Sequence, residues 1–116
     1  MPLEQPLTVA ACQMCSGLEK ADNLAVAERL IRQAAQRDAK LIALPELFNC
    51  LGPLGYMIEQ AEPIPGPTSD WLSSLASELQ VTLCAGSITE KTTQPGKGHN
   101  TSLIFGPDGQ LLGTYR

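Results

Sequence analysis

The residues best suited to chemistry in this chain are one glutamate and four cysteines. In the stretch LIALPELFNC, residues 41–50, an apolar segment leads into Pro45, and Glu46 follows at once. Proline has no N–H to donate to a sheet, so it ends strand pairing. If the apolar segment is a parallel strand, Glu46 lies just beyond its carboxyl end, where ligands bind in open α/β sheets. Glu46 is therefore a candidate general base, and the alternative is a solvated loop carboxylate or a charge at a helix N-terminus.

Two bulky apolar residues, Leu47 and Phe48, follow Glu46 directly. A carboxylate works well as a base near neutral pH when it is partly removed from water. We therefore expect Leu47 and Phe48 to shield the carboxylate of Glu46 from bulk solvent.

The four cysteines offer weaker candidates; they are Cys12, Cys15, Cys50 and Cys84. Cys12 and Cys15 form a C-x-x-C pair, which would suit a redox site, but we favour free, partly buried thiols in a reducing compartment. Cys50 falls in the loop after Glu46 and not at a strand-to-helix turn, so packing is favoured over a nucleophilic role. His99 is the only histidine, and no second C-x-x-C completes a zinc set, so we expect no metal.

Apolar periodicity predicts the elements that position these residues. Period-two or continuous apolar runs predict strands at residues 7–14, 40–44, 81–88, 100–106 and 110–116. Period-3.6 patterns predict one helix from an N-cap at Asp22 or Asn23 to about Asp38, and a second that starts near Thr68. A Pro- and Gly-rich loop, with a short helical turn at residues 56–61, separates strand 40–44 from the second helix. The order β-α-β-α-β-β-β indicates an α/β fold with three parallel strands followed by an antiparallel pair, joined at Pro107-Asp108-Gly109.

Composition excludes several classes of protein. Hydrophobic residues make up 43% and charged residues 17% of the 116, as in an ordinary globular domain. The net charge is −4 and no lysine or arginine run occurs, which argues against nucleic acid or an anionic membrane as a partner. No apolar run reaches the ~20 residues that cross a bilayer, and MPLEQPLTV is not a secretory signal, so we expect a cytoplasmic location.

The order and the amino-acid sequences of these segments resemble those of one family. TVAACQM, LIALPELF, VTLCAGSI and HNTSLIFGPDGQLLGTYR together are similar to the amino-terminal part of the nitrilase, or carbon–nitrogen hydrolase, superfamily. The resemblance spans essentially the whole chain, and the LPELFNCLGP wording leans toward its amidase branch, which includes ω-amidase and deaminated-glutathione amidase. It implies a four-layer α-β-β-α sandwich, of which residues 1–116 are the amino-terminal portion of a single domain.

The resemblance also implies a mechanism. Family members use a Glu-Lys-Cys triad and no cofactor, and their glutamate maps onto Glu46. Their lysine directly follows a segment like Gly113 to Arg116, and their cysteine lies further downstream, so this chain is expected to end before both. Asn100 and Thr101 match a recurrent Asn-Thr pair, which we interpret as support for the site. The expected partners are a small amide or nitrile substrate and, in a full-length protein, further copies of the chain. The residues that would bind the substrate are not identified.

Two other functions remain open. The chain is non-catalytic, either a truncated product or a binding and oligomerisation module, if nothing supplies the lysine and cysteine. A small nucleotide- or flavin-binding domain would need a glycine-rich phosphate loop after the first strand, and CQMCSG is a poor one. In the hydrolase reading, half of the sandwich is missing. One face of the sheet should then lie uncovered, and the chain by itself should be inactive and inclined to associate.

Overall fold

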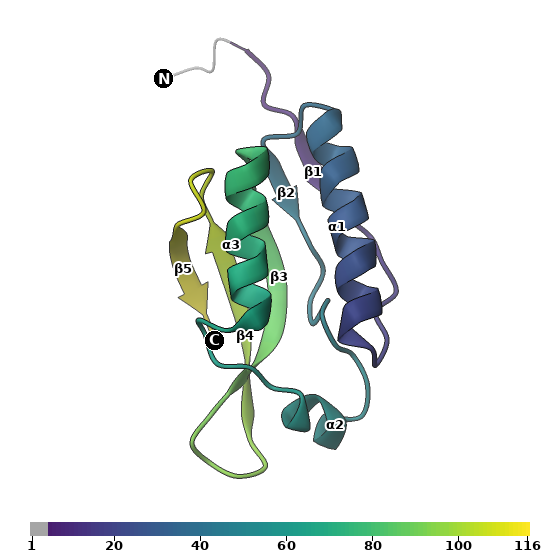
Figure 1. Cartoon of the computed structure of the whole chain (residues 1–116), viewed down its shortest axis with the longest axis vertical. Helices are drawn as coiled ribbons and strands as arrows, with labels where there is room; N and C mark the ends of the chain where they lie inside the picture. The colour runs from purple at the N-terminus through teal and green to yellow at the C-terminus, as the bar shows by residue number, and fades with distance from the viewer. Residues whose placement is uncertain (1–4) are drawn as a thin grey trace.

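The computed structural model describes residues 5–116 as one five-stranded sheet with helices (Figure 1). Its strands run in the spatial order β1 (Val9–Ala11), β2 (Leu41–Ala43), β3 (Thr82–Lys91), β4 (Gly98–Phe105) and β5 (Leu111–Tyr115). The pairs β1–β2 and β2–β3 are parallel, and β3–β4 and β4–β5 are antiparallel. The predicted α/β class and the predicted change from parallel to antiparallel pairing are both confirmed.

Three helices connect the strands: α1 (Lys20–Gln36), α2 (Leu54–Glu59) and α3 (Pro67–Leu79). The short helix α2 lies in the Pro- and Gly-rich loop, where the sequence predicted only a helical turn. Strand β1 is shorter than the predicted segment at residues 7–14. The reason is that β1 pairs with β2 alone, and the last bond on its carboxyl side is donated by Cys12 N to Ala43 O at 2.9 Å.

The predicted N-cap of the first helix is wrong. Helix α1 begins at Lys20, and Glu19 is its N-cap residue. Asn23 lies inside the first turn and is only 5% exposed. Its side chain does not cap the helix but bonds to Gly17 and Asn49, two residues of neighbouring loops. An asparagine can satisfy both its oxygen and its nitrogen in such a bridge, so tertiary contacts override its capping preference.

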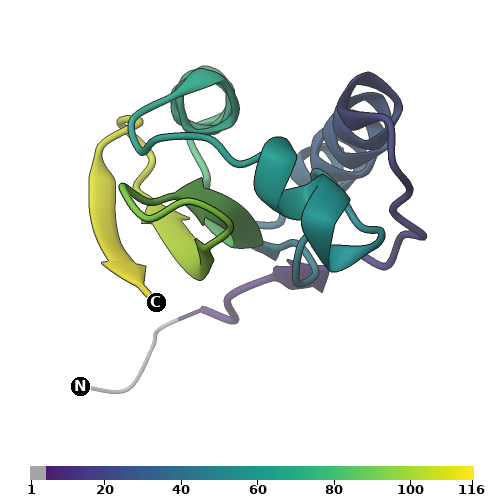
Figure 2. The ribbon, with the colours of Figure 1, turned by 90° about the horizontal axis from the view of Figure 1, so that it is seen from below.

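The hydrophobic core lies between the sheet and its two long helices. Figure 2 shows α1 and α3 side by side on one face of the sheet. Helix α1 buries Ala27, Ile31 and Ala34, and α3 buries Leu72, Leu75 and Ala76. These side chains pack with the helix-facing residues of the sheet, among them Ile42, Leu83, Leu103 and Phe105. The spacing of these helix residues is that of one helical face, as the sequence predicted.

The opposite face of the sheet carries exposed apolar side chains. Val9 is 58% exposed, Ile104 41% and Tyr115 80%. Among residues 5–116 no long helix covers this face (Figures 1 and 2). The expectation of an uncovered face is therefore confirmed for the described part of the chain.

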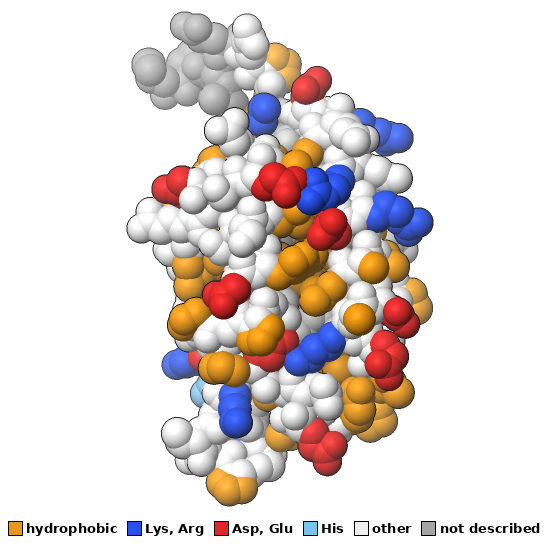
Figure 3. Space-filling model, in the orientation of Figure 1, with side chains coloured by type: hydrophobic (Ala, Val, Ile, Leu, Met, Phe, Trp, Pro, Cys, Tyr) orange, Lys and Arg blue, Asp and Glu red, His pale blue; other side chains and the backbone are white. Residues whose placement is uncertain are grey.

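The helix-covered side is polar by contrast. Figure 3 shows side chains of both charges spread over α1 and α3, with hydrophobic atoms between the two helices. One of the ion pairs here joins the helices directly, because the Arg32 guanidinium of α1 contacts the Glu78 carboxylate of α3. Exposed pairs of this kind contribute at most about 1 kcal/mol.

Candidate functional site

The chain leaves β2 in a tight turn that carries Glu46. Residues 46–49 form this turn, two residues beyond the last hydrogen bond of β2, which Leu44 N donates to Cys84 O at 2.9 Å. Glu46 thus lies beyond the carboxyl end of a parallel strand, as predicted, and its residue is exposed. Leu47 has φ of 51°, a left-handed conformation that non-glycine residues rarely adopt. Strained backbone of this type is found repeatedly at functional sites.

One side chain of β4 holds the carboxylate of Glu46. Asn100 Nδ2 donates a hydrogen bond to Glu46 Oε1 at 2.7 Å. Within residues 5–116 the carboxylate of Glu46 receives no other hydrogen bond, so its Oε2 stays available to another proton donor. Asn100 therefore orients the carboxylate without occupying both of its oxygens. Of the Asn-Thr pair, only Asn100 contacts Glu46, because Thr101 Oγ1 donates to Glu90 on the other face of β4.

Glu46 and Asn100 line an open hollow of about 410 Å³. Its wall is formed by the turn after β2 and by strands β3, β4 and β5. The lining residues are Glu46, Gly86, Ser87, Asn100, Ser102, Tyr115 and Arg116. Because β2, β3 and β4 are consecutive in the sheet, segments that are far apart in the sequence meet here. The volume is in the range of small-molecule sites.

A bulge in β3 brings that strand against the turn. The partner of Cys84 is Ile104 and the partner of Ser87 is Ser102, so β3 contains one extra residue between these pairs. Gly86 within the bulge has φ of 54°, and an ideal Cβ built on it would lie 1.9 Å from Pro45 O. Only glycine permits both this conformation and this close approach. The next residue, Ser87, accepts a hydrogen bond from Leu47 N at 2.9 Å.

The shielding expected from Phe48 is absent. Phe48 is fully buried on the helix-covered side, with its ring centroid 6.4 Å from that of Trp71. The left-handed backbone at Leu47 turns the chain so that Phe48 enters the core, while Glu46 faces the hollow. Trp71 itself is half-buried, and its indole N–H donates to Glu28 at 3.1 Å.

None of the four cysteines lines the hollow. Cys50 is buried, and its thiol contacts Leu18 O at 3.6 Å. Burial raises the pKa of the Cys50 thiol, and the nearby charge of Lys20 offsets this only in part. Burial likewise raises the pKa of Cys12, whereas Cys15 is exposed. Raised pKa values reduce the thiolate fraction and hence nucleophilicity.

A buried polar network next to the turn was not predicted. Glu62, which is 6% exposed, receives bonds from Thr68 N (2.7 Å), Thr68 Oγ1 (2.6 Å) and Lys20 Nζ (2.9 Å). Thr68 N belongs to the first turn of α3, where a carboxylate also interacts favourably with the helix dipole. Asn49 Nδ2 joins the network with 3.3 Å contacts to Glu62 and Thr68. Nothing in a loop sequence such as AEPIPG marks its glutamate as buried.

A second ion pair fixes the carboxyl end of β5 beside the hollow. Arg116 Nε and Nη2 donate to Glu90 Oε1 and Oε2 at 2.8 and 3.0 Å, a bidentate arrangement. Thr101 Oγ1 also donates to Glu90, at 2.8 Å. The Arg116 hydrogen bonds outweigh partial burial and lower the pKa of Glu90. Glu90 follows Ile88 by two residues, so strand alternation could have identified it as a buried position.

Stability should fall in acid because of Glu62. Burial alone would raise the pKa of Glu62, but the bonds from Thr68 and Lys20 outweigh it, so the folded-state pKa lies below the ordinary value. A lowered pKa stabilises the fold above the unfolded value of about 4.3, and this contribution is lost as the pH falls through the folded pKa. Urea unfolding between neutral pH and about pH 3 should show this loss.

The matched control for that prediction is a second glutamate. Glu62→Gln should lower stability at neutral pH and flatten its dependence on acid. Glu59→Gln, which removes an exposed carboxylate on α2, should leave both unchanged. Equal pH dependence of the wild type and Glu62→Gln would contradict the prediction.

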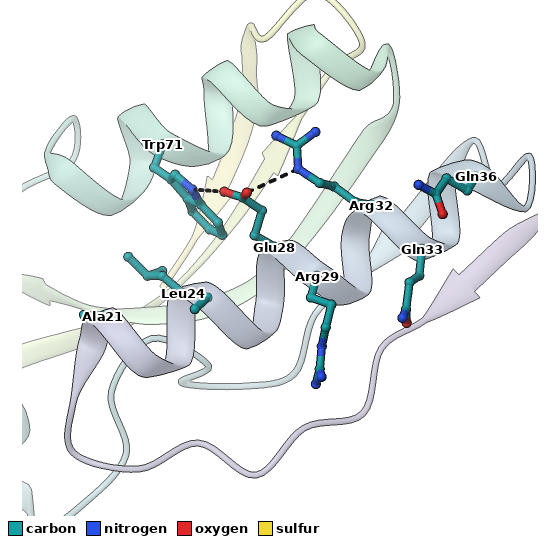
Figure 4. A pocket seen from close by; sticks show the side chains of 9 residues that line it. Ala21, Leu24, Glu28, Arg29, Arg32, Gln33, Gln36 and Trp71 are labelled. Carbon is teal, nitrogen blue, oxygen red and sulfur yellow. Dashed lines mark hydrogen bonds and ion pairs between the residues drawn. The ribbon is translucent and has the colours of Figure 1, made fainter.

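Another hollow lies between α1 and α3 on the outer surface (Figure 4). It measures about 720 Å³, and two of its polar side chains, Glu28 and Arg32, are paired. Figure 4 shows Glu28 between two partners, the Trp71 indole N–H at 3.1 Å and Arg32 Nε at 3.2 Å. Glu28, Arg32 and Trp71 thus satisfy one another on a helix surface, and this hollow is lined by no cysteine, serine or histidine of residues 5–116.

Residues 5–116 contain neither a metal cluster nor a membrane-spanning helix. There, no three His, Cys, Asp or Glu side chains gather closely enough to hold a metal ion. No helix of this part of the chain is long and apolar enough to cross a membrane.

Comparison with known proteins identifies the family. The sequence profile described as carbon-nitrogen hydrolase matches residues 8–116. The chain is 46% identical to omega-amidase NIT2-B of Xenopus laevis over 97 residues. This matched region makes up 84% of this chain and 34% of that protein. Omega-amidase NIT2 of Danio rerio is 43% identical over 108 residues, or 93% of this chain and 38% of that protein. The chain thus spans about a third of the length of these curated relatives.

Solved structures share the fold. Nit3 of Saccharomyces cerevisiae, a member of branch 10 of the nitrilase superfamily, matches with a TM-score of 0.76 and 34% identity, over 87% of this chain and 40% of that one. The NitFhit protein of C. elegans matches with a TM-score of 0.83 and 25% identity, over 95% of this chain and 28% of that one. The mixed sheet with its helices is therefore nitrilase-like, and the chain belongs to the carbon–nitrogen hydrolase family.

Proposed function

We propose that this chain supplies the general base, Glu46, of an amidase that hydrolyses the carbon–nitrogen bond of a small carboxylic-acid amide. The reaction class follows from the family, and the preference for amides follows from the omega-amidase relatives. A nitrile is the alternative substrate.

The observation that carries the proposal is the setting of the Glu46 carboxylate. It lies on an open hollow, is held at Oε1 by Asn100, and keeps Oε2 available within the described residues. A general base needs this combination of fixed orientation and an unoccupied oxygen within reach of the proton that it takes.

The family resemblance supplies the remaining steps. Glu46 accepts the proton of a cysteine thiol, the thiolate adds to the amide carbon, and a lysine stabilises the negative charge on the carbonyl oxygen. Glu46 then gives the proton to the departing ammonia. Water attacks the resulting thioester and passes a proton to Glu46, which returns it to the cysteine as the carboxylic acid leaves.

We further propose that the lysine and the cysteine come from chain that follows these 116 residues in a longer enzyme. Two observations support this part of the proposal. The relatives are about three times as long as the matched region. The hollow is lined by neither a lysine nor a cysteine of residues 5–116. The uncovered sheet face is the place where a second layer of the same domain would pack.

The setting of the enzyme is part of the proposal. None of the four cysteines is paired in a disulfide, which is typical of a reducing compartment such as the cytoplasm. The edge strand β5 is consistent with association of copies of the full-length protein, because an unpaired strand edge favours contacts with another chain.

The test is ammonia release from succinamic acid, propionamide and propionitrile. The longer protein that carries this chain should act on at least one of the two amides more rapidly than on the nitrile. Absence of ammonia release from all three would remove the proposal, and a preference for propionitrile would replace amidase by nitrilase.

The 116-residue chain alone should release no ammonia. Glu46 has no thiol to activate on its hollow, so a single triad member remains. The same assay with the purified chain checks this, and thermal unfolding confirms that it is folded. Turnover that disappears in Glu46→Gln would show that the chain is complete in itself. If no longer protein exists in the source cells, the non-catalytic module becomes the better description.

A further inference from the structure

The turn that carries Glu46 is fastened to the protein at each of the residues that follow. The first bond is the one from Leu47 N to Ser87 Oγ of β3, at 2.9 Å. The second is donated by Ser16 Oγ to Phe48 O at 2.7 Å. Ser87 follows the turn in the sequence and lies in β3, whereas Ser16 precedes the turn and lies in the loop before α1.

The next residues are held in the same way. Asn23 Nδ2 donates to Asn49 O at 2.9 Å and to Gly17 O at 2.8 Å, so one buried amide joins two loops. Leu51 N in turn donates to Gly17 O at 3.0 Å. Within residues 5–116 no buried side-chain nitrogen or oxygen lacks a hydrogen-bond partner, so burial of these polar groups leaves none of them unsatisfied.

This fastening opposes a strained backbone. Leu47 at φ 51° costs about 1–2 kcal/mol relative to a right-handed conformation. Left to itself, the turn would relax and swing Glu46 away from Asn100. Several bonds of about 1 kcal/mol each suffice to hold it.

We propose that Ser16, Asn23 and Ser87 are positioning residues for Glu46. They fix the backbone directly after the carboxylate and thereby its direction toward the hollow. Ser16 and Asn23 lie outside the hollow, and Ser87, which lines it, is bonded through its hydroxyl oxygen to the Leu47 N–H. The expected effect of these residues on turnover rests on the proposed function. Their expected effect on the opening of the turn does not rest on it.

The chain offers a matched pair of serines for the test. Ser16 Oγ donates to Phe48 O at 2.7 Å, and Ser73 Oγ donates to Gly109 O at 2.6 Å, both partly buried. Ser73 ties α3 to the turn between β4 and β5, away from Glu46. Ser16→Ala and Ser73→Ala therefore remove equivalent bonds and should lower the stability of the fold by similar amounts.

Hydrogen exchange followed by mass spectrometry measures directly how often the turn opens. In peptides covering residues 45–53, Ser16→Ala should accelerate exchange by about fivefold, which corresponds to ~1 kcal/mol of local opening. Ser73→Ala should leave these peptides unchanged. Ser16→Thr keeps the hydroxyl and should restore protection, and Asn23→Asp, which removes both donated bonds, should exceed Ser16→Ala. Equal exchange in Ser16→Ala and Ser73→Ala would overturn the proposal.

Kinetics of the longer protein provide the second reading. Ser16→Ala should lower kcat for the accepted amide by about tenfold with little change in KM, because a displaced base slows proton transfer and not binding. Ser73→Ala should keep the wild-type kcat. Faster exchange with an unchanged kcat would overturn the positioning role. A wild type without amidase activity would end the proposed function, and the exchange comparison would still decide whether these residues hold the turn.

Discussion

Replacing Glu46 by glutamine is expected to lower kcat for amide hydrolysis by about 10³-fold in the protein that carries this chain. Glutamine cannot accept a proton from the thiol, so the thiolate is not formed at neutral pH and water is not activated afterwards. Its side-chain oxygen can still accept the bond from Asn100 Nδ2. The substitution thus removes the base and keeps the local geometry.

Stability should separate this effect from a folding defect. Glu46 is exposed, and substitutions at such positions usually change stability by less than about 0.5 kcal/mol. Urea unfolding of Glu46→Gln should therefore match the wild type. Glu59→Gln, which removes another exposed carboxylate, should match it in both stability and kcat. Wild-type turnover in Glu46→Gln would mean that another group is the base.

The fold was predictable because its elements are periodic. Leu72, Leu75 and Ala76 recur at helical spacing, and the structure buries all three against the sheet. The hairpin between β4 and β5 followed from Pro107-Asp108-Gly109, and Gly109 indeed has φ of 85°. Element boundaries were less predictable, because they depend on pairing partners: β1 pairs with β2 only as far as Ala43, the last residue of β2.

The site was predictable only at its centre. The proline before Glu46 marked the end of a strand, and parallel topology then placed the carboxylate beyond the carboxyl ends of the strands. The direction of Phe48 was not predictable, because it depends on the left-handed conformation of Leu47. The polar groups that hold the turn come from positions as distant as Ser16 and Ser87, and a single sequence does not show which distant residues meet.

Replacing Gly86 by alanine is expected to cost at least about 3 kcal/mol of stability and to displace the Glu46 turn. Two effects add. A left-handed conformation costs an alanine about 1–2 kcal/mol. The new Cβ would also lie 1.9 Å from Pro45 O and 2.7 Å from Leu44 O, both backbone atoms that cannot rotate away. The bulge of β3 and the exit of β2 must therefore separate.

Gly96 provides a control that isolates the second effect. It lies in the loop between β3 and β4 with φ of 73°, and nothing lies within 4 Å of an added Cβ. Gly96→Ala should lose only the conformational term, about 1 kcal/mol, with unchanged exchange in residues 45–53. Gly86→Ala should lose more and should expose these amides, because separation of the strands breaks the bond from Leu47 N to Ser87 Oγ.

The comparison tests how Glu46 reaches the hollow. If the contact between the bulge and the turn sets the position of the carboxylate, Gly86→Ala should abolish most amidase turnover, and Gly96→Ala should leave it intact. Equal losses of stability in the two variants would mean that the bulge and the turn move apart at little cost. The bulge would then be a feature of the sheet alone, and the position of Glu46 would depend on the bonds from Ser16 and Asn23.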